Sequence, residues 1–168
     1  MTIGQAPRPS YDRATPVLIV DDEYMMVEVI TAMLNKLGLR DVDFACDGLS
    51  ALAQLRERAY GLVISDLKMA GIDGLEFVRR MRTDAALRHT PFIMTTASRD
   101  LGVARQAKAA GVDHYLLKPF RSDALHAKLE AVIGEHALML SRMRQIEAPE
   151  AARTRDVRTI ASSFRRED

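Results

Sequence analysis

Five short apolar runs, separated by longer segments with helical spacing, constrain the fold of this chain more than any other feature. Four of the runs are almost continuously apolar, which is typical of strands buried on both faces of a parallel sheet. The second run is mixed, so it is predicted to form an edge strand. The runs lie at 17–20, 42–46, 62–65, 92–95 and 114–117.

The segments between the runs predict helices, because their apolar residues recur at intervals of three and four. They lie at 24–37, 48–58, 74–82, 100–110 and from 122 onward. Strand and helix thus alternate with short connections, which predicts an α/β fold with one doubly wound parallel sheet and helices on both faces. In the first helix, the predicted buried face consists of Met26, Val29, Ile30, Met33, Leu34 and Leu37.

Composition excludes several classes of protein. The chain has 24 Lys and Arg against 23 Asp and Glu, a balance that argues against a general nucleic-acid binder. A single cysteine, Cys46, excludes an internal disulfide framework and a multi-cysteine zinc site, and it favours a cytoplasmic location. The sequence has no run of about 18 uncharged apolar residues, so no transmembrane segment is predicted.

Polar residues stand at the carboxyl ends of four predicted strands. Asp21 and Asp22 follow the first strand, Asp66 follows the third, Thr96 lies at the end of the fourth and Lys118 follows the fifth. In a parallel sheet these ends meet at one edge, where α/β proteins bind their ligands. Any one such aspartate is more often a turn or cap residue, but the five together favour a site.

The residue types in this cluster indicate phosphoryl transfer. Three neighbouring carboxylates repel one another unless a cation neutralises them, and Mg²⁺ prefers such oxygen ligands. The ammonium of Lys118 and the hydroxyl of Thr96 suit phosphoryl oxygens, which leaves Asp66 as the nucleophile that forms an aspartyl phosphate. A hydrolase of the acid-phosphatase type is disfavoured, because no second carboxylate is placed as its general acid.

Four segments resemble the receiver domain of two-component response regulators, and the match covers about residues 16–136. The spacing of Asp66 to Thr96 and of Asp66 to Lys118 is similar to that of the single-domain, chemotaxis-type (CheY-like) family. The resemblance implies a flavodoxin-like sheet with strand order 2-1-3-4-5. The four segments are VLIVDDE (17–23), SDLKMAGIDGLEF (65–77), PFIMTTAS (91–98) and HYLLKPF (114–120).

The resemblance also implies a role for each polar residue. Asp66 would accept a phosphoryl group from a sensor histidine kinase or a histidine phosphotransfer protein. Asp21 or Asp22, with Asp66 and the backbone carbonyl of Lys68, would hold Mg²⁺. The family usually has proline where this chain has Ala70, which would leave the loop after Asp66 less restricted.

Thr96 and Lys118 would bind the phosphoryl oxygens, and Tyr115 would be a switch that turns inward as Thr96 moves toward the phosphate. The face formed by the fourth helix, fifth strand and fifth helix would then change its preference for a downstream target protein, which the sequence does not identify. The chain would catalyse only its own phosphotransfer and dephosphorylation, so it would not be an enzyme in the usual sense.

The predicted domains are a flexible N-terminal arm at 1–16, a receiver domain at 17–136 and a C-terminal extension at 137–168. The extension is too short for a DNA-binding output domain. In it the fifth helix either continues to about 147 or frays near 136–140. Continuation is supported by a heptad seam of Leu125, Leu129, Val132, His136, Met139, Met143 and Ile146.

Two alternatives to a plain phosphorylatable signalling module remain from the sequence. The extended fifth helix would make the chain a dimerising regulator, hence a homodimer. The Arg-rich tail after Pro149 would form an amphipathic helix that binds an anionic nucleotide such as cyclic di-GMP, or else a solvated tail.

Overall fold

The computed structural model describes residues 11–147, and residues 1–10 and 148–168 lie outside the described part. The strands are β1 (Val17–Val20), β2 (Val42–Ala45), β3 (Leu62–Asp66), β4 (Phe92–Thr96) and β5 (His114–Leu117). The helices are α1 (Tyr24–Lys36), α2 (Gly48–Glu57), α3 (Gly74–Thr83), α4 (Leu101–Ala110) and α5 (Ser122–Glu147).

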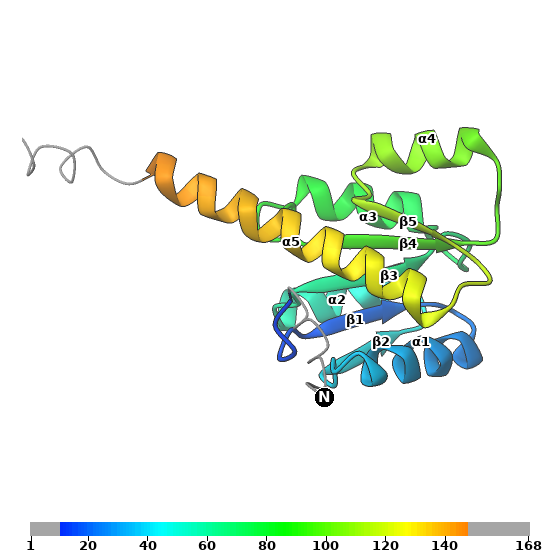
Figure 1. Ribbon diagram of the computed structural model, residues 1–168. Coiled ribbons are helices and arrows are strands. Elements are labelled where there is room, and N and C mark those ends of the chain that lie inside the picture. The colour runs from blue at the N-terminus through cyan, green and yellow to red at the C-terminus, as the bar shows by residue number, and fades with distance from the viewer. Residues whose placement is uncertain (1–10, 148–168) are drawn as a thin grey trace, which may run out of the picture. The chain divides into compact units, whose positions relative to one another are not determined.

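The strands form one parallel sheet in the order β2-β1-β3-β4-β5, which confirms the predicted doubly wound fold (Figure 1). β2 lies at one edge of the sheet, as its mixed composition indicates. β5 lies at the other edge, and only its Leu116 is fully buried. A near-continuous apolar run is therefore not enough to distinguish a central strand from an edge strand here.

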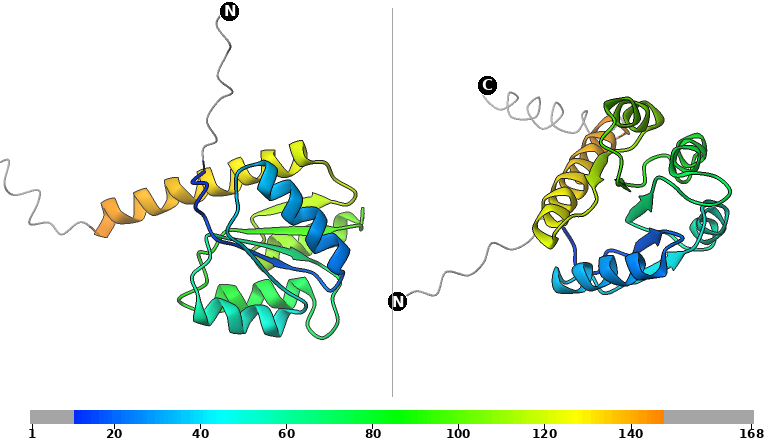
Figure 2. Two further views of the ribbon diagram at one scale, coloured as in Figure 1. Left: turned by 90° about the horizontal axis from the view of Figure 1, so that it is seen from below. Right: turned by 90° about the vertical axis from the view of Figure 1, so that its right-hand side faces the viewer.

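Helices cover both faces of the sheet (Figure 2). Because successive strand residues point to opposite faces, each strand feeds two separate cores. Val17 and Ile19 of β1 pack with α1 and α5, whereas Leu18 and Val20 pack with α2, α3 and α4. The strand ends that carry the polar residues are held between these two cores.

The buried face of α1 agrees with the predicted one except at two positions. Ile30 and Leu34 are buried, and Met26, Met33 and Leu37 are partly buried against the core. Val27 is buried, however, whereas Val29 is 45% exposed. Apolar spacing therefore locates the helix and most of its buried face, but it leaves the exact rotation of the helix open.

The end of the predicted N-terminal arm is packed against the sheet's helices. Tyr11 is only 4% exposed, and its hydroxyl donates a hydrogen bond to the carbonyl oxygen of Leu37 over 3.2 Å. Its ring meets the ring of His126 edge-on, with 6.0 Å between centroids. Tyr11 is therefore anchored in the core, whereas the flexibility of the arm stays a prediction, and residues 1–10 lie outside the described residues.

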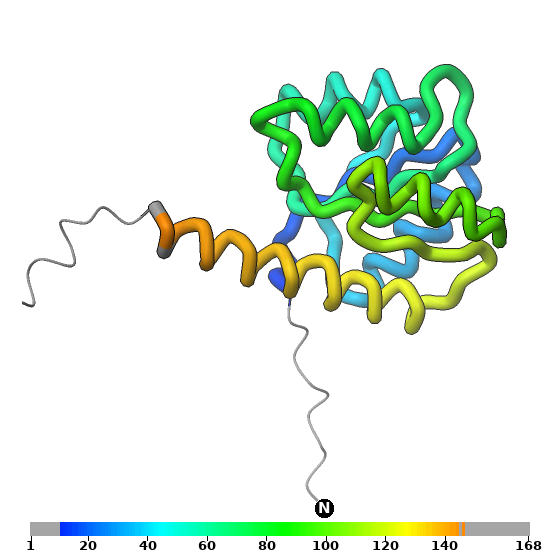
Figure 3. Tube along the Cα trace, turned by 90° about the horizontal axis from the view of Figure 1, so that it is seen from above, coloured from blue at the N-terminus to red at the C-terminus, as the bar shows by residue number. Residues whose placement is uncertain are grey.

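α5 is one continuous helix of 26 residues, from Ser122 to Glu147 (Figure 3). Continuation of the helix is thus confirmed, and fraying near 136–140 is wrong. The chain divides into two compact units, Met1–His136 and Ala137–Asp168, and α5 contributes to both. Among the described residues, no helix is long and apolar enough to cross a membrane.

Candidate phosphoryl-acceptor site

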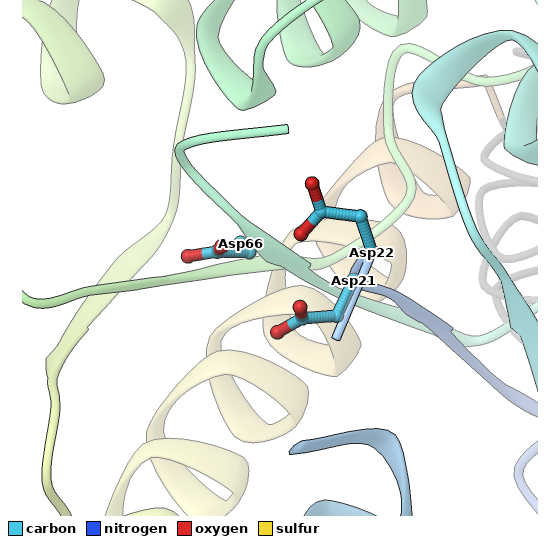
Figure 4. A group of neighbouring side chains, drawn as sticks. All are labelled: Asp21, Asp22 and Asp66. Carbon is cyan, nitrogen blue, oxygen red and sulfur yellow. The ribbon is translucent and has the colours of Figure 1, made fainter. Parts of the chain in front are cut away.

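Three aspartates meet where β1 and β3 end side by side. Asp21 and Asp22 follow β1 directly, and Asp66 is the last residue of β3, the strand paired with β1 (Figure 4). One carboxylate oxygen from each lies within 4.8 Å of the others. The topology predicted from the sequence therefore brings these three residues together.

The loop after Asp66 is shaped by a close approach of two backbones. The amide of Gly74 donates to the carbonyl oxygen of Leu67 over 2.8 Å, and a Cβ at position 74 would collide with the backbone carbonyl of Asp66. Asp73 then caps α3 by accepting from the amide of Glu76 over 2.8 Å. Sequence reasoning missed Gly74, although an Asp-Gly pair just before a helix is the signal that would have found it.

Lys118 joins two of the carboxylates. Its Nζ lies 3.2 Å from Asp21 Oδ2 and 3.2 Å from Asp66 Oδ1. Asp21 is 2% exposed, and its other oxygen accepts a hydrogen bond from the amide of Glu23 over 2.9 Å. A buried carboxylate needs such partners, because its desolvation is otherwise unfavourable.

The pKa of Asp66 is raised above its usual value, mainly because the carboxyl group is half-buried. The neighbouring carboxylate of Asp21 also raises this pKa. The ammonium of Lys118 and a hydrogen bond from the amide of Leu67 act in the opposite direction. The carboxyl group of Asp66 therefore holds a proton more tightly than an exposed aspartate, and Lys118 limits that effect.

Thr96 and Tyr115 are connected through one residue, Ser98. The amide of Ser98 donates to Thr96 Oγ1 over 3.0 Å, and the carbonyl oxygen of Ser98 accepts from the Tyr115 hydroxyl over 2.9 Å. Thr96 is 2% exposed, and its own carbonyl oxygen accepts from the amide of Lys118 over 2.7 Å. Sequence analysis named Thr96 and Tyr115 but did not foresee Ser98 as the link between them.

Thr95 is the residue of β4 that pairs in register with Asp66. Strand alternation places its side chain on the face of Ile93, opposite to that of Thr96. The side chain is fully buried, and its hydroxyl has no hydrogen-bond partner among the described residues. Thr95 is therefore a polar group in a position that an apolar side chain of the same shape would fill.

Lys68 and Ala70 lie in the loop after β3, and both are exposed. Gly71 follows them in a left-handed conformation, with φ of +80°, which favours glycine at this point of the loop. The role of the Lys68 carbonyl as a metal ligand stays a prediction.

Comparison with known proteins identifies the class of this fold and site. The family model for the response regulator receiver domain matches residues 17–130. The chain belongs to this family, as the sequence motifs predicted.

Curated relatives of this chain include chemotaxis proteins. Chemotaxis protein CheY-3 of Vibrio cholerae is 34% identical over 116 residues, which cover 69% of this chain and 89% of that protein. Chemotaxis protein CheY of Pseudomonas aeruginosa is also 34% identical, over 69% of this chain and 94% of its own length. These relatives account for the receiver region of the chain.

Solved structures show the same likeness. Chemotaxis protein CheY4 of Vibrio cholerae superposes with a TM-score of 0.67 at 31% identity, over 71% of this chain and 98% of its own. The receiver domain of the sensor histidine kinase PA1611 of Pseudomonas aeruginosa gives 0.66 at 31% identity, over 72% and 98%. That structure has a magnesium ion coordinated in its active-site cleft.

Proposed function

We propose that this protein is a stand-alone response regulator that accepts a phosphoryl group on Asp66. The proposal rests on the position of Lys118 at the carboxyl edge of the sheet. Its Nζ lies 3.2 Å from both Asp21 Oδ2 and Asp66 Oδ1. A mobile ammonium beside a half-buried carboxylate is the arrangement that neutralises charge developing on a transferred phosphoryl group. The donor would be a phosphohistidine on a sensor kinase or a phosphotransfer protein.

The bonds that form and break in the transfer step belong to this chain and to the donor. An oxygen of the ionised Asp66 carboxylate attacks phosphorus, the new P–O bond forms, and the P–N bond to the donor imidazole breaks. The imidazole nitrogen keeps the electron pair of the broken bond and takes up a proton from solvent. Lys118 turns its ammonium from the carboxylate to a phosphoryl oxygen, and the hydroxyl of Thr96 donates to another.

The three carboxylates fit a divalent cation, because they supply oxygen ligands within 4.8 Å of one another. Asp21, Asp22 and Asp66, with the backbone carbonyl of Lys68, would hold Mg²⁺. The ion would neutralise the phosphoryl oxygens and draw them to Asp66. Asp22 is exposed and Asp21 is buried, so the ligands would range from the surface to the floor of the site.

The downstream signal would arise when Thr96 turns toward the phosphoryl group. This movement breaks the hydrogen bond from the Ser98 amide, so the carbonyl oxygen of Ser98 shifts and Tyr115 loses its acceptor. Tyr115 then turns inward, and the surface of α4, β5 and α5 changes its preference for a target protein. On this proposal the chain has no activity beyond its own phosphotransfer and dephosphorylation.

The test is labelling of the full chain with radioactive acetyl phosphate, with and without Mg²⁺. Labelling is expected to require Mg²⁺ and to be lost in Asp66→Asn. The matched control is Asp123→Asn, which makes the same change at an exposed aspartate in the first turn of α5. Wild-type chain that stays unlabelled while a known receiver domain is labelled under the same conditions would contradict the proposal.

Of the two alternatives from the sequence, only self-association through α5 concerns residues that the structure describes. The nucleotide-binding tail falls on residues after Pro149, outside the described part of the chain, and stays a prediction. Self-association through α5 is favoured by one observation, because the helix runs unbroken to Glu147 and its last turns carry exposed apolar side chains.

A further inference from the structure

α1 and β2 border a groove of about 410 Å³ at the outer edge of the sheet, which we call the α1–β2 groove (Figure 1). Glu28 and Asn35 lie along its α1 side, and Val42 lies on its β2 side. Tyr24 and Phe44 also line the groove, where they are 61% and 45% exposed. Large aromatic side chains left open beside a groove are typical of a surface that binds a partner.

The outer edge of β2 has backbone groups that face away from the sheet, because β2 pairs only with β1. The carbonyl oxygens of Asp41 and Ala45 accept hydrogen bonds from the β1 side. Since successive residues of a strand turn their backbone groups to opposite sides, those of Val42 and Phe44 point outward. The carbonyl oxygen of Phe44 accordingly accepts from Gln54 Nε2 over 3.0 Å. This edge can therefore hydrogen-bond to an added strand.

The side chains of an added strand would enter the groove. Val42 and Phe44 pair in register with Val17 and Ile19, which pack in the core on the α1 face of the sheet. The side chains of Val42 and Phe44 therefore lie on that face as well. Every second side chain of a strand beside β2 would lie there too, between β2 and α1. Backbone bonds at an open edge together with pockets for alternate side chains are the two parts of β-strand addition.

The charges and rings of the groove favour a basic side chain. Glu28 is exposed, and it forms no ion pair with another residue of the described range 11–147. The rings of Tyr24 and Phe44 meet edge-on with 5.9 Å between centroids, and exposed aromatic faces attract cations. Residues 21–47, which include α1 and β2, contain seven acidic and two basic residues, so this side of the protein attracts a positively charged segment.

We propose that the α1–β2 groove binds an extended basic segment of a partner protein, which adds a strand to β2 and places an Arg or Lys side chain beside Glu28. A second copy of β2 fits less well, because joining Val42 of one copy to Phe44 of the other in an antiparallel pair sets Asp43 opposite its own copy, which is repulsive. β2 has only four residues, so the contact is small and transient. None of the phosphoryl-site residues lines the groove, so this binding goes beyond phosphoryl transfer and does not require it.

The test is an NMR titration of the full chain, labelled with ¹⁵N, against two synthetic pentapeptides with blocked ends. The first has the sequence Thr-Val-Arg-Val-Thr, and the second has Glu in place of Arg. With the Arg peptide, the amide signals of Val42 and Phe44 are expected to shift and to approach saturation by about 5 mM. The Glu peptide should bind at least about 5-fold more weakly, because it meets the carboxylate of Glu28.

Variants of the chain test the two groups that would hold the cation. Glu28→Gln removes the carboxylate and Tyr24→Leu removes one ring, and each should weaken binding of the Arg peptide about 3-fold. The matched control is Glu57→Gln, because Glu57 is exposed on α2 and does not line the groove, so its affinity should be unchanged. Asp66→Asn should bind the Arg peptide like the wild type, which separates this proposal from failure of the phosphoryl-transfer proposal.

Three results would overturn the proposal. The first is that the Val42 and Phe44 signals stay in place at the highest concentration of the Arg peptide. The second is that the Glu peptide binds as tightly as the Arg peptide, or that Glu28→Gln binds like the wild type, since the groove would then not select a basic side chain. The third is that these signals shift when the chain is diluted without peptide, which would mean that a second copy occupies the edge.

Discussion

The hydroxyl of Tyr115 donates to the carbonyl oxygen of Ser98 over 2.9 Å, and the amide of Ser98 donates to Thr96 over 3.0 Å. Thr96 and Tyr115 are thus coupled through the two backbone groups of one loop residue. Rotation of the Thr96 hydroxyl toward another partner would therefore release the Ser98 amide. The position of the Tyr115 ring is therefore tied to the position of Thr96.

Tyr115→Phe removes one end of this connection and keeps the ring. We expect the free energy of unfolding to fall by about 1 kcal/mol, since one partly buried hydrogen bond is lost. Labelling of Asp66 should persist, because the Tyr115 hydroxyl donates to the Ser98 carbonyl oxygen and not to a carboxylate of the site. Urea unfolding measures the expected loss of stability, and acetyl-phosphate labelling measures whether Asp66 still reacts. A variant that is stable but no longer labelled would contradict this reading of Tyr115.

Thr95 and Thr96 provide a contrast between two neighbouring hydroxyls. Thr95→Val removes a buried hydroxyl that has no hydrogen-bond partner in the part of the chain that the structure describes, so the free energy of unfolding should rise by about 1 kcal/mol with labelling unchanged. Thr96→Val removes the acceptor of the Ser98 amide and should lower both stability and labelling rate. Paired unfolding and labelling measurements on the two variants check this. Equal effects of both substitutions would show that strand alternation does not separate their roles.

Much of the site was predictable because it follows from strand order. The aspartates and Lys118 lie at the end of a strand or within two residues after it, so the strand assignments alone bring them to one edge of the sheet. The link through Ser98 was not predictable, since it depends on the path of a loop whose hydrogen bonds leave no periodic signal. Gly74 was not predictable for the same reason. Glycine is required there only because the start of α3 lies so close to the end of β3.

The parts of the fold that the sequence missed share one physical origin. Val27 and Val29 are both apolar and lie on nearly opposite sides of α1, so which one is buried depends on how the whole core sets the rotation of the helix. Tyr11 lies in a segment rich in proline and polar residues, and a single aromatic anchor there gives no pattern to detect. Periodic patterns located the helices and strands correctly, whereas the exact rotation of α1 and single long-range contacts were not predicted.

Lys118→Met tests the counter-charge of the site. Without the ammonium, the labelling rate of Asp66 should fall by roughly 10²–10³-fold, as for loss of one electrostatic contact in a reacting site. The pKa of Asp66 should rise further, because only the hydrogen bond from the Leu67 amide then opposes the effects of burial and of Asp21. A carboxyl group whose pKa is higher in the folded state than in the unfolded state stabilises the fold at low pH, and this stabilisation is lost as pH rises through the folded pKa.

The variant should therefore be less destabilised, relative to wild type, in mildly acid solution than at neutral pH. Urea unfolding at both pH values measures this difference. Lys108→Met is the matched control, since Lys108 is exposed on α4 and away from the carboxylates. If Lys118→Met lowered the free energy of unfolding by the same amount at both pH values, the result would contradict the proposed role of Lys118.

Addition of Mg²⁺ should stabilise the fold, because ion binding to the three aspartates favours the folded state by mass action. At ten times the dissociation constant the gain is about 1.4 kcal/mol, which thermal unfolding detects. Protons compete for Asp66, whose pKa lies above the ordinary value of about 3.9. The gain in stability should therefore shrink as pH falls toward the raised pKa, and it should do so at higher pH than for a site of ordinary carboxylates.

Asp22→Asn should lower the gain in stability at neutral pH, whereas Asp123→Asn should leave it unchanged. A gain that is independent of pH, or equal in both variants, would mean that the ion acts elsewhere on the protein.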